Sequence, residues 1–79
     1  MDKNVEIALL LDFYGNMLTE RQREIMNLYY EDNLSLSEIA EELNISKQGV
    51  SDSLKRSEKV LYDTESKLKL MEQQFKNEK

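Results

Sequence analysis

The chain has 79 residues, which leaves room for one domain with a small core. It contains neither cysteine nor histidine, which excludes disulfides, zinc–thiolate sites and the most common general base of enzymes. The 16 acidic and 11 basic residues give a formal net charge of −5, which by itself indicates no partner. We therefore expect a non-enzymatic protein with no catalytic residues, no metal, no cofactor and no small-molecule substrate.

The first predicted element is a helix over residues 4–14, and its apolar residues cover more than one face. They form two stripes, Val5, Ala8 and Leu9 on one and Ile7, Leu10, Leu11 and Tyr14 on the other, with Phe13 filling the gap beside Leu9. A surface helix of a globular protein normally has one apolar stripe. The surplus predicts that this helix is sandwiched between its own core and a second chain.

The same N-terminal region bears on localisation. Its apolar run, residues 7–11, is shorter than the roughly 7–15 apolar residues of a signal peptide and the roughly 20 of a membrane-spanning helix. We therefore expect a cytoplasmic protein without membrane insertion.

Two further helices are predicted from capping signals. Thr19 and Gln22 have the spacing of a capping box, which predicts a helix from Thr19 to about Tyr30. Ser35 and Glu38 repeat the pattern and predict a short helix over residues 36–43. Strand-like alternation is absent throughout, so the predicted fold class is all-α.

The linker over residues 44–46 is the most informative segment. Asn44 is the non-glycine residue type that best tolerates a left-handed turn, and Ser46 is a good N-cap for the next helix. A short helix, a tight turn and a capped second helix predict a helix-turn-helix over about residues 35–56, within a single domain of residues 1–79.

No helix breaker follows Ser46, so one long helix is predicted over about residues 47–75. At 1.5 Å per residue it would be about 45 Å long. Its apolar residues recur with alternating spacings of four and three, which is typical of a coiled-coil seam. We expect a homodimer whose interface includes Leu10, Phe13, Leu61, Leu68, Met71 and Phe75. The same surface could instead bind a different protein. The alternative is that the first helix folds back along the long helix of the same chain.

The start of the long helix is the candidate nucleic-acid interface. If Val50 and Leu54 face the core, the side chains that can contact bases and phosphates are Lys47, Gln48, Ser51, Lys55 and Arg56. Arg21 and Arg23, at the start of the second predicted helix, could bind the sugar–phosphate backbone of the nucleic acid nearby. Residues 46–59 carry four basic and two acidic residues, whereas residues 1–45 carry three basic and ten acidic. Because so many acidic residues would repel phosphates, an alternative is that the helix-turn-helix is a scaffold that binds protein and no nucleic acid.

The segments LLLDFYGNMLTERQ, LYYEDNLSLSEIAEELNISKQGV and SLKRSE resemble the YlxM family, and the helix-turn-helix resembles region four of bacterial sigma factors. The resemblance implies an all-α protein without catalytic activity. It also implies a regulatory or accessory role in the signal recognition particle pathway, with a component of that particle as partner. The alternatives are a DNA-binding transcription regulator and a protein-interaction scaffold. The target of the helix-turn-helix would be DNA or RNA.

Overall fold

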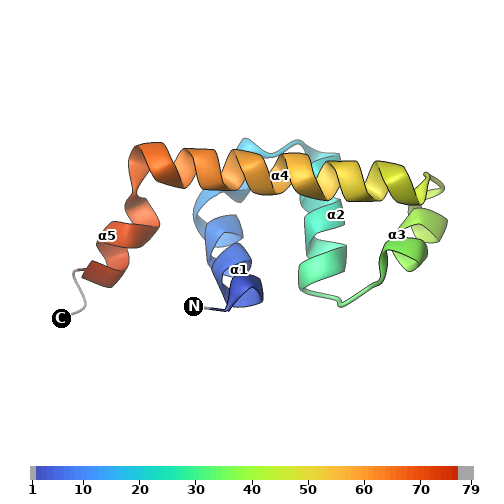
Figure 1. Cartoon of the computed structure of the whole chain (residues 1–79), viewed down its shortest axis with the longest axis horizontal. Coiled ribbons are helices and arrows are strands. Elements are labelled where there is room, and N and C mark those ends of the chain that lie inside the picture. The colour runs from blue at the N-terminus through green and yellow to red at the C-terminus, as the bar shows by residue number, and fades with distance from the viewer. Residues whose placement is uncertain (1, 77–79) are drawn as a thin grey trace.

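The structure is a computed structural model that describes residues 2–76, with side chains through residue 74. It consists of α1 (Lys3–Tyr14), the 3₁₀ turn η1 (Gly15–Met17), α2 (Glu20–Tyr30), α3 (Leu36–Leu43), α4 (Lys47–Leu68) and α5 (Leu70–Lys76). In this part of the chain every regular element is helical, which confirms the predicted all-α class. Figure 1 shows α4 as a straight rod from which the other helices descend on one side.

The core lies along the face of α4 that the other helices cover. Helices α1, α2, α3 and α5 all contact α4, and the molecule measures 45 × 20 × 16 Å along its principal axes. One hydrophobic cluster runs through it, made of Ile7, Leu10, Leu11, Tyr14, Leu18, Ile25, Met26, Ile39, Ala40, Val50, Leu54, Leu61 and Met71. Because α4 contributes to this cluster over much of its length, it fixes the positions of the shorter helices.

The helix-turn-helix is built by local capping, as predicted. In both capping boxes the hydroxyl of Thr19 or Ser35 accepts a hydrogen bond from the backbone N–H of Gln22 or Glu38 at 3.1 Å. In return, the side chain of Gln22 or Glu38 accepts a hydrogen bond from the backbone N–H of the capping residue at 2.9–3.0 Å. Asn44 adopts the left-handed conformation with φ 57° and ψ 46°, and Ser46 accepts from the Gly49 N–H at 2.9 Å. These bonds satisfy backbone groups that would otherwise be orphaned at the helix ends.

The predicted long helix is wrong beyond Leu68. It stops there because Lys69 is left-handed, with φ 55° and ψ 29°, and α5 then turns off the axis of α4 (Figure 1). A left-handed backbone costs a non-glycine residue about 1–2 kcal/mol. The cost is offset by the burial of Met71 in the core cluster and by hydrogen bonds that the first backbone N–H groups of α5 donate to Tyr14 and Glu65.

The inner face of α1 packs on its own chain, which is the alternative that the sequence left open. Leu10 and Leu61 are fully buried and Met71 is 9% exposed. These three predicted interface residues are therefore part of the core in this structure, where their own chain covers their side chains. Phe13 and Leu68 stay 38% and 47% exposed. The side chain of Phe75 lies outside the described residues.

Three tyrosine–glutamate hydrogen bonds join α4 to α1 and α2. Tyr14 donates to Glu65 Oε1 at 2.6 Å, Tyr30 donates to Glu58 Oε2 at 2.8 Å, and Tyr62 donates to Glu6. Sequence periodicity gives no sign of such bonds, because the partners lie 28–56 residues apart.

These bonds predict a loss of stability at high pH. Burial, together with the bond to a carboxylate, raises the pKa of Tyr14 and Tyr30, and raises the pKa of Tyr62 to about 12. Between pH 10 and 12 the unfolded chain binds fewer protons at these tyrosines than the folded chain, so stability falls as the pH rises. We expect Tm to fall through this range, and to fall less in Tyr30→Phe. An identical pH dependence in Tyr30→Phe would contradict this origin.

A buried hydroxyl in α4 predicts a stabilising substitution. Ser57 is fully buried, and among the described residues no group hydrogen bonds to its Oγ. We expect Ser57→Ala to raise the free energy of unfolding by about 1 kcal/mol, because it removes an unpaired buried hydroxyl and favours the helix. Urea denaturation measures the change. The exposed Ser66→Ala, in the same helix, controls for helix propensity, and an equal gain there would contradict the burial argument.

Candidate nucleic-acid interface

The first three turns of α4 form an outward-facing surface on a rigid base. The Ser46 cap fixes the start of the helix, and Val50 and Leu54 are buried in the core. Lys47, Gln48, Lys55 and Arg56 are exposed, while Ser51 is half-buried. Val50 and Leu54 are therefore buried as predicted, and the five predicted residues lie on the parts of the helix that remain accessible.

The exposed cations of this surface have no acidic partner in the part of the chain that the structure describes. Within the described residues, no carboxylate lies within 4 Å of a charged nitrogen of Lys47, Lys55 or Arg56, although such pairs occur elsewhere in the chain. By contrast, Lys59 is paired with Asp63 at 3.2 Å. Among the described residues, these three cations therefore have no acidic partner that a phosphate would have to displace. We refer to Lys47, Lys55 and Arg56 as the α4 cation surface.

Gln48 and the two arginines of α2 are less free than the sequence suggested. The Gln48 amide donates to Asp52 Oδ1 at 3.0 Å, so reading a base would require it to leave this partner. Arg21 pairs with Glu24 at 3.7 Å, and Arg23 donates to Asn16 Oδ1 at 2.9 Å. All three bonds are exposed, and exposed bonds of this kind contribute little stability and can be exchanged for phosphate contacts.

The helix before the turn carries the opposite charge. Glu38, Glu41 and Glu42 are exposed on α3 and, with Leu34, line a shallow cleft. The bond to Ser35 holds the pKa of Glu38 below its usual range, so this carboxyl is ionised at neutral pH. The helix-turn-helix is thus divided into an anionic helix and a cationic helix. A polyanion would approach α4 and be repelled by α3, which restricts how it can dock.

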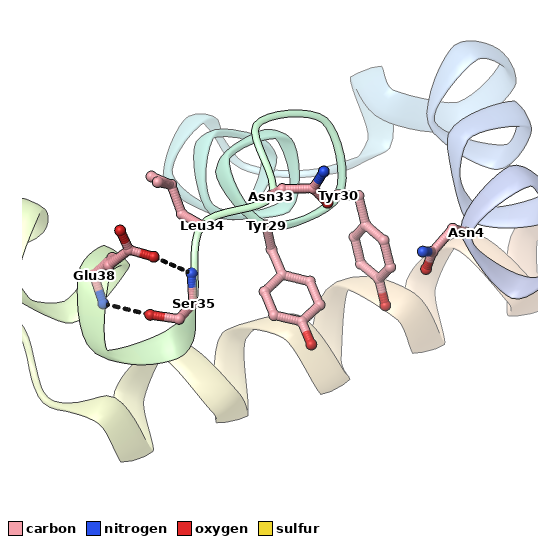
Figure 2. A pocket seen from close by; sticks show the side chains of 7 residues that line it. All are labelled: Asn4, Tyr29, Tyr30, Asn33, Leu34, Ser35 and Glu38. Atoms are coloured by element: carbon pink, nitrogen blue, oxygen red, sulfur yellow. Dashed lines mark hydrogen bonds between the residues drawn. The ribbon is translucent and has the colours of Figure 1, made fainter.

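A second cleft, of about 310 Å³, lies between α1, α2 and the start of α3 and shares Leu34 and Glu38 with the first. Figure 2 shows its lining, formed by Asn4, Tyr29, Tyr30, Asn33, Leu34, Ser35 and Glu38. The rings of Tyr29 and Tyr30 meet edge to face with centroids 4.9 Å apart. Ser35 and Glu38 are bonded to each other, and Tyr30 is bonded to Glu58. The sequence pattern gives no sign of this cleft, because the cleft is formed where three elements meet.

Metal sites and membrane-spanning helices are two further features to consider in the described residues. No group of three or more acidic residues is arranged to hold a metal ion in residues 2–76. No helix in that range is long and apolar enough to cross a membrane.

Comparison with known proteins gives a consistent family assignment. A family model, UPF0122, described as "Putative helix-turn-helix protein, YlxM / p13 like", matches residues 1–79. A UPF0122 protein of Clostridium botulinum is 48% identical over 79 residues, covering 100% of this chain and 72% of the relative. One of Acetivibrio thermocellus is 58% identical over 71 residues, covering 90% of this chain and 61% of the relative. One of Halalkalibacterium halodurans is 49% identical over 71 residues, covering 90% and 65%. The chain therefore spans between 61% and 72% of the length of these three relatives.

Proposed function

The chain belongs to the UPF0122 family of YlxM- and p13-like helix-turn-helix proteins, and from this premise we propose that it is a non-enzymatic cytoplasmic regulator that binds nucleic acid through the first turns of α4. The observation that carries the proposal is the α4 cation surface, which is exposed and has no acidic partner among the described residues. It lies on a helix whose start is fixed by its cap and by core contacts. Recognition helices of helix-turn-helix proteins contact nucleic acid through the same first turns.

The acidic remainder of the chain sets the expected character of this binding. Phosphate contacts supply most non-specific affinity, and three cations give few of them. We expect binding that is weak at physiological salt. The logarithm of the binding constant should fall with the logarithm of the salt concentration with a slope of about −3, because each of three phosphate contacts contributes about −0.9. A shallow slope near zero would favour a surface that binds protein instead.

The resemblance to the YlxM family supports an accessory role in the signal recognition particle pathway. In this proposal the cation surface binds the RNA of that particle or the DNA of a regulated gene, and a particle component is the partner. Capture from a cell extract by the tagged chain tests the proposal, with matched samples treated with ribonuclease, deoxyribonuclease or neither. Loss of the captured particle components after ribonuclease supports the RNA assignment, and capture resistant to both nucleases contradicts nucleic-acid binding.

A second proposal, self-association, rests on a different surface. The outer stripe of α1 is uncovered: Val5 is 51% and Phe13 38% exposed, and Leu9 is half-buried. Since these residues are four apart, they form one ridge along α1, in which Leu9 also packs against the core cluster while Val5 and Phe13 stay exposed. Ridges of this kind pack into the grooves of a second helix. We propose that a second copy packs on this ridge in a two-fold dimer. A monomeric mass in sedimentation at micromolar concentration would contradict it, and Phe13→Asp should convert a dimer to monomer.

A further inference from the structure

The break between α4 and α5 is made by one residue. The Lys69 N–H donates to the Glu65 carbonyl at 2.7 Å and closes α4, while its own carbonyl accepts from the Gln73 N–H at 2.9 Å and opens α5. Lys69 has a left-handed φ of 55°. If only this residue changed to a right-handed backbone, α4 and α5 would become one continuous helix.

Two side chains stabilise the bend between α4 and α5 by accepting hydrogen bonds from the first N–H groups of α5, which have no carbonyl partner within that helix. The Leu70 N–H donates to the Tyr14 hydroxyl at 3.1 Å, and the Met71 and Glu72 N–H groups donate to the two oxygens of Glu65 at 3.1 and 2.9 Å. Tyr14 also donates to Glu65 at 2.6 Å and is 2% exposed. We call this arrangement the Tyr14–Glu65 latch.

The latch replaces hydrogen bonds that a straight helix would make by itself. In a continuous helix the three N–H groups would bond to the carbonyls of residues 66, 67 and 68. The number of backbone N–H groups satisfied is therefore the same in the bent and straight forms. Neither glycine nor proline lies near the break, and residues 67–74 are all good helix formers, so the local sequence favours the straight form. The latch and the burial of Met71 favour the bent form.

We propose that the α4–α5 junction is a two-state hinge at Lys69, closed by the Tyr14–Glu65 latch and opened by extension of α4 through α5. Opening removes α5 from α1 and uncovers Met71 and Tyr14. On the extended helix Met71 lies three residues after Leu68 and shares its face, and Leu68 is already 47% exposed. The open state thus exposes Met71 and Tyr14, which the closed state buries, and this loss of burial favours the closed state.

A distance measurement tests the hinge, and the absence of native cysteine makes it direct. Spin labels attached to Ala8→Cys on α1 and Gln73→Cys on α5, both exposed positions, report whether α5 lies beside α1. We expect one dominant short distance in the otherwise unchanged chain. A second, longer distance should grow when the latch is removed by Tyr14→Phe with Glu65→Ala.

A matched pair at Lys69 tests the hinge without touching the core, because this side chain is exposed. Lys69→Gly relieves the left-handed backbone and should retain the short distance, whereas Lys69→Ala favours a continuous helix. We expect the ratio of long to short distances to differ by about tenfold or more between the two variants. Equal distance distributions in these two variants would overturn the proposal, even if the latch variant failed to fold.

Discussion

Replacing Lys47 and Arg56 with alanine is expected to weaken nucleic-acid binding by about 2–4 kcal/mol, which is roughly a 30- to 1,000-fold rise in Kd. Both side chains are exposed on α4, and no carboxylate among the described residues pairs with them, so their loss removes contacts to the ligand and leaves the fold intact. The salt slope of binding should also become shallower by about two. Fluorescence anisotropy with labelled duplexes of DNA and RNA, repeated at several salt concentrations, measures both changes.

The control for this variant has the same change in net charge at a different place. Lys3 lies at the start of α1 and Lys67 near the end of α4, and Lys3→Ala with Lys67→Ala also removes two positive charges. If the effect came only from net charge, the two double variants would lose equal affinity. An equal loss would therefore contradict the α4 surface, whereas a small loss in the control supports it.

Leu61→Ala is expected to lower the free energy of unfolding by about 2–5 kcal/mol, because it leaves a cavity where α4 joins the core. A chain of this size has a total stability of about 4–12 kcal/mol, so this variant should be partly unfolded at moderate temperature. Leu61 is fully buried in its own chain, although the sequence pattern assigned it to a dimer interface. Urea denaturation followed by circular dichroism measures the change.

Leu68→Ala is the matched control in the same helix. Its side chain is 47% exposed, so we expect a loss below about 1 kcal/mol. The expected difference between the two leucines comes from burial alone, because the chemical change is identical. If Leu68→Ala were as destabilising as Leu61→Ala, Leu68 would have to be covered in solution, and the protein concentration dependence of its unfolding would show whether a second copy covers it.

The parts of the fold that the sequence predicted well are those fixed by neighbouring residues. Thr19 with Gln22 and Ser35 with Glu38 act over three residues, so their spacing alone predicted where α2 and α3 begin. Asn44 likewise carries its own preference for the left-handed turn. The exposed residues of early α4 followed from the same argument, since the positions of Val50 and Leu54 determine which side chains face outward.

The parts that the sequence did not predict depend on residues far apart in the chain. The helix break at Lys69 is stabilised by Tyr14, whose hydroxyl accepts a hydrogen bond from the Leu70 N–H, 56 residues later in the chain. A repeat of apolar residues continues through this position, so periodicity predicted one helix where the tertiary contacts produce two. The pairing of Gln48 with Asp52 is local, but helical spacing alone does not decide whether a glutamine bonds its neighbour or stays free.

The unbroken course of α4 has a mechanical consequence. Its 22 residues extend about 33 Å at 1.5 Å per residue, and α1 contacts the same helix that begins with Lys47 at the turn. The α4 residues that bond α1, Glu58, Tyr62 and Glu65, come 11–18 residues after Lys47, which is about 17–27 Å along the helix axis. Because one unbroken helix joins them, this spacing is fixed, and a molecule bound on α1 and a polyanion bound at Lys47 would be held that far apart.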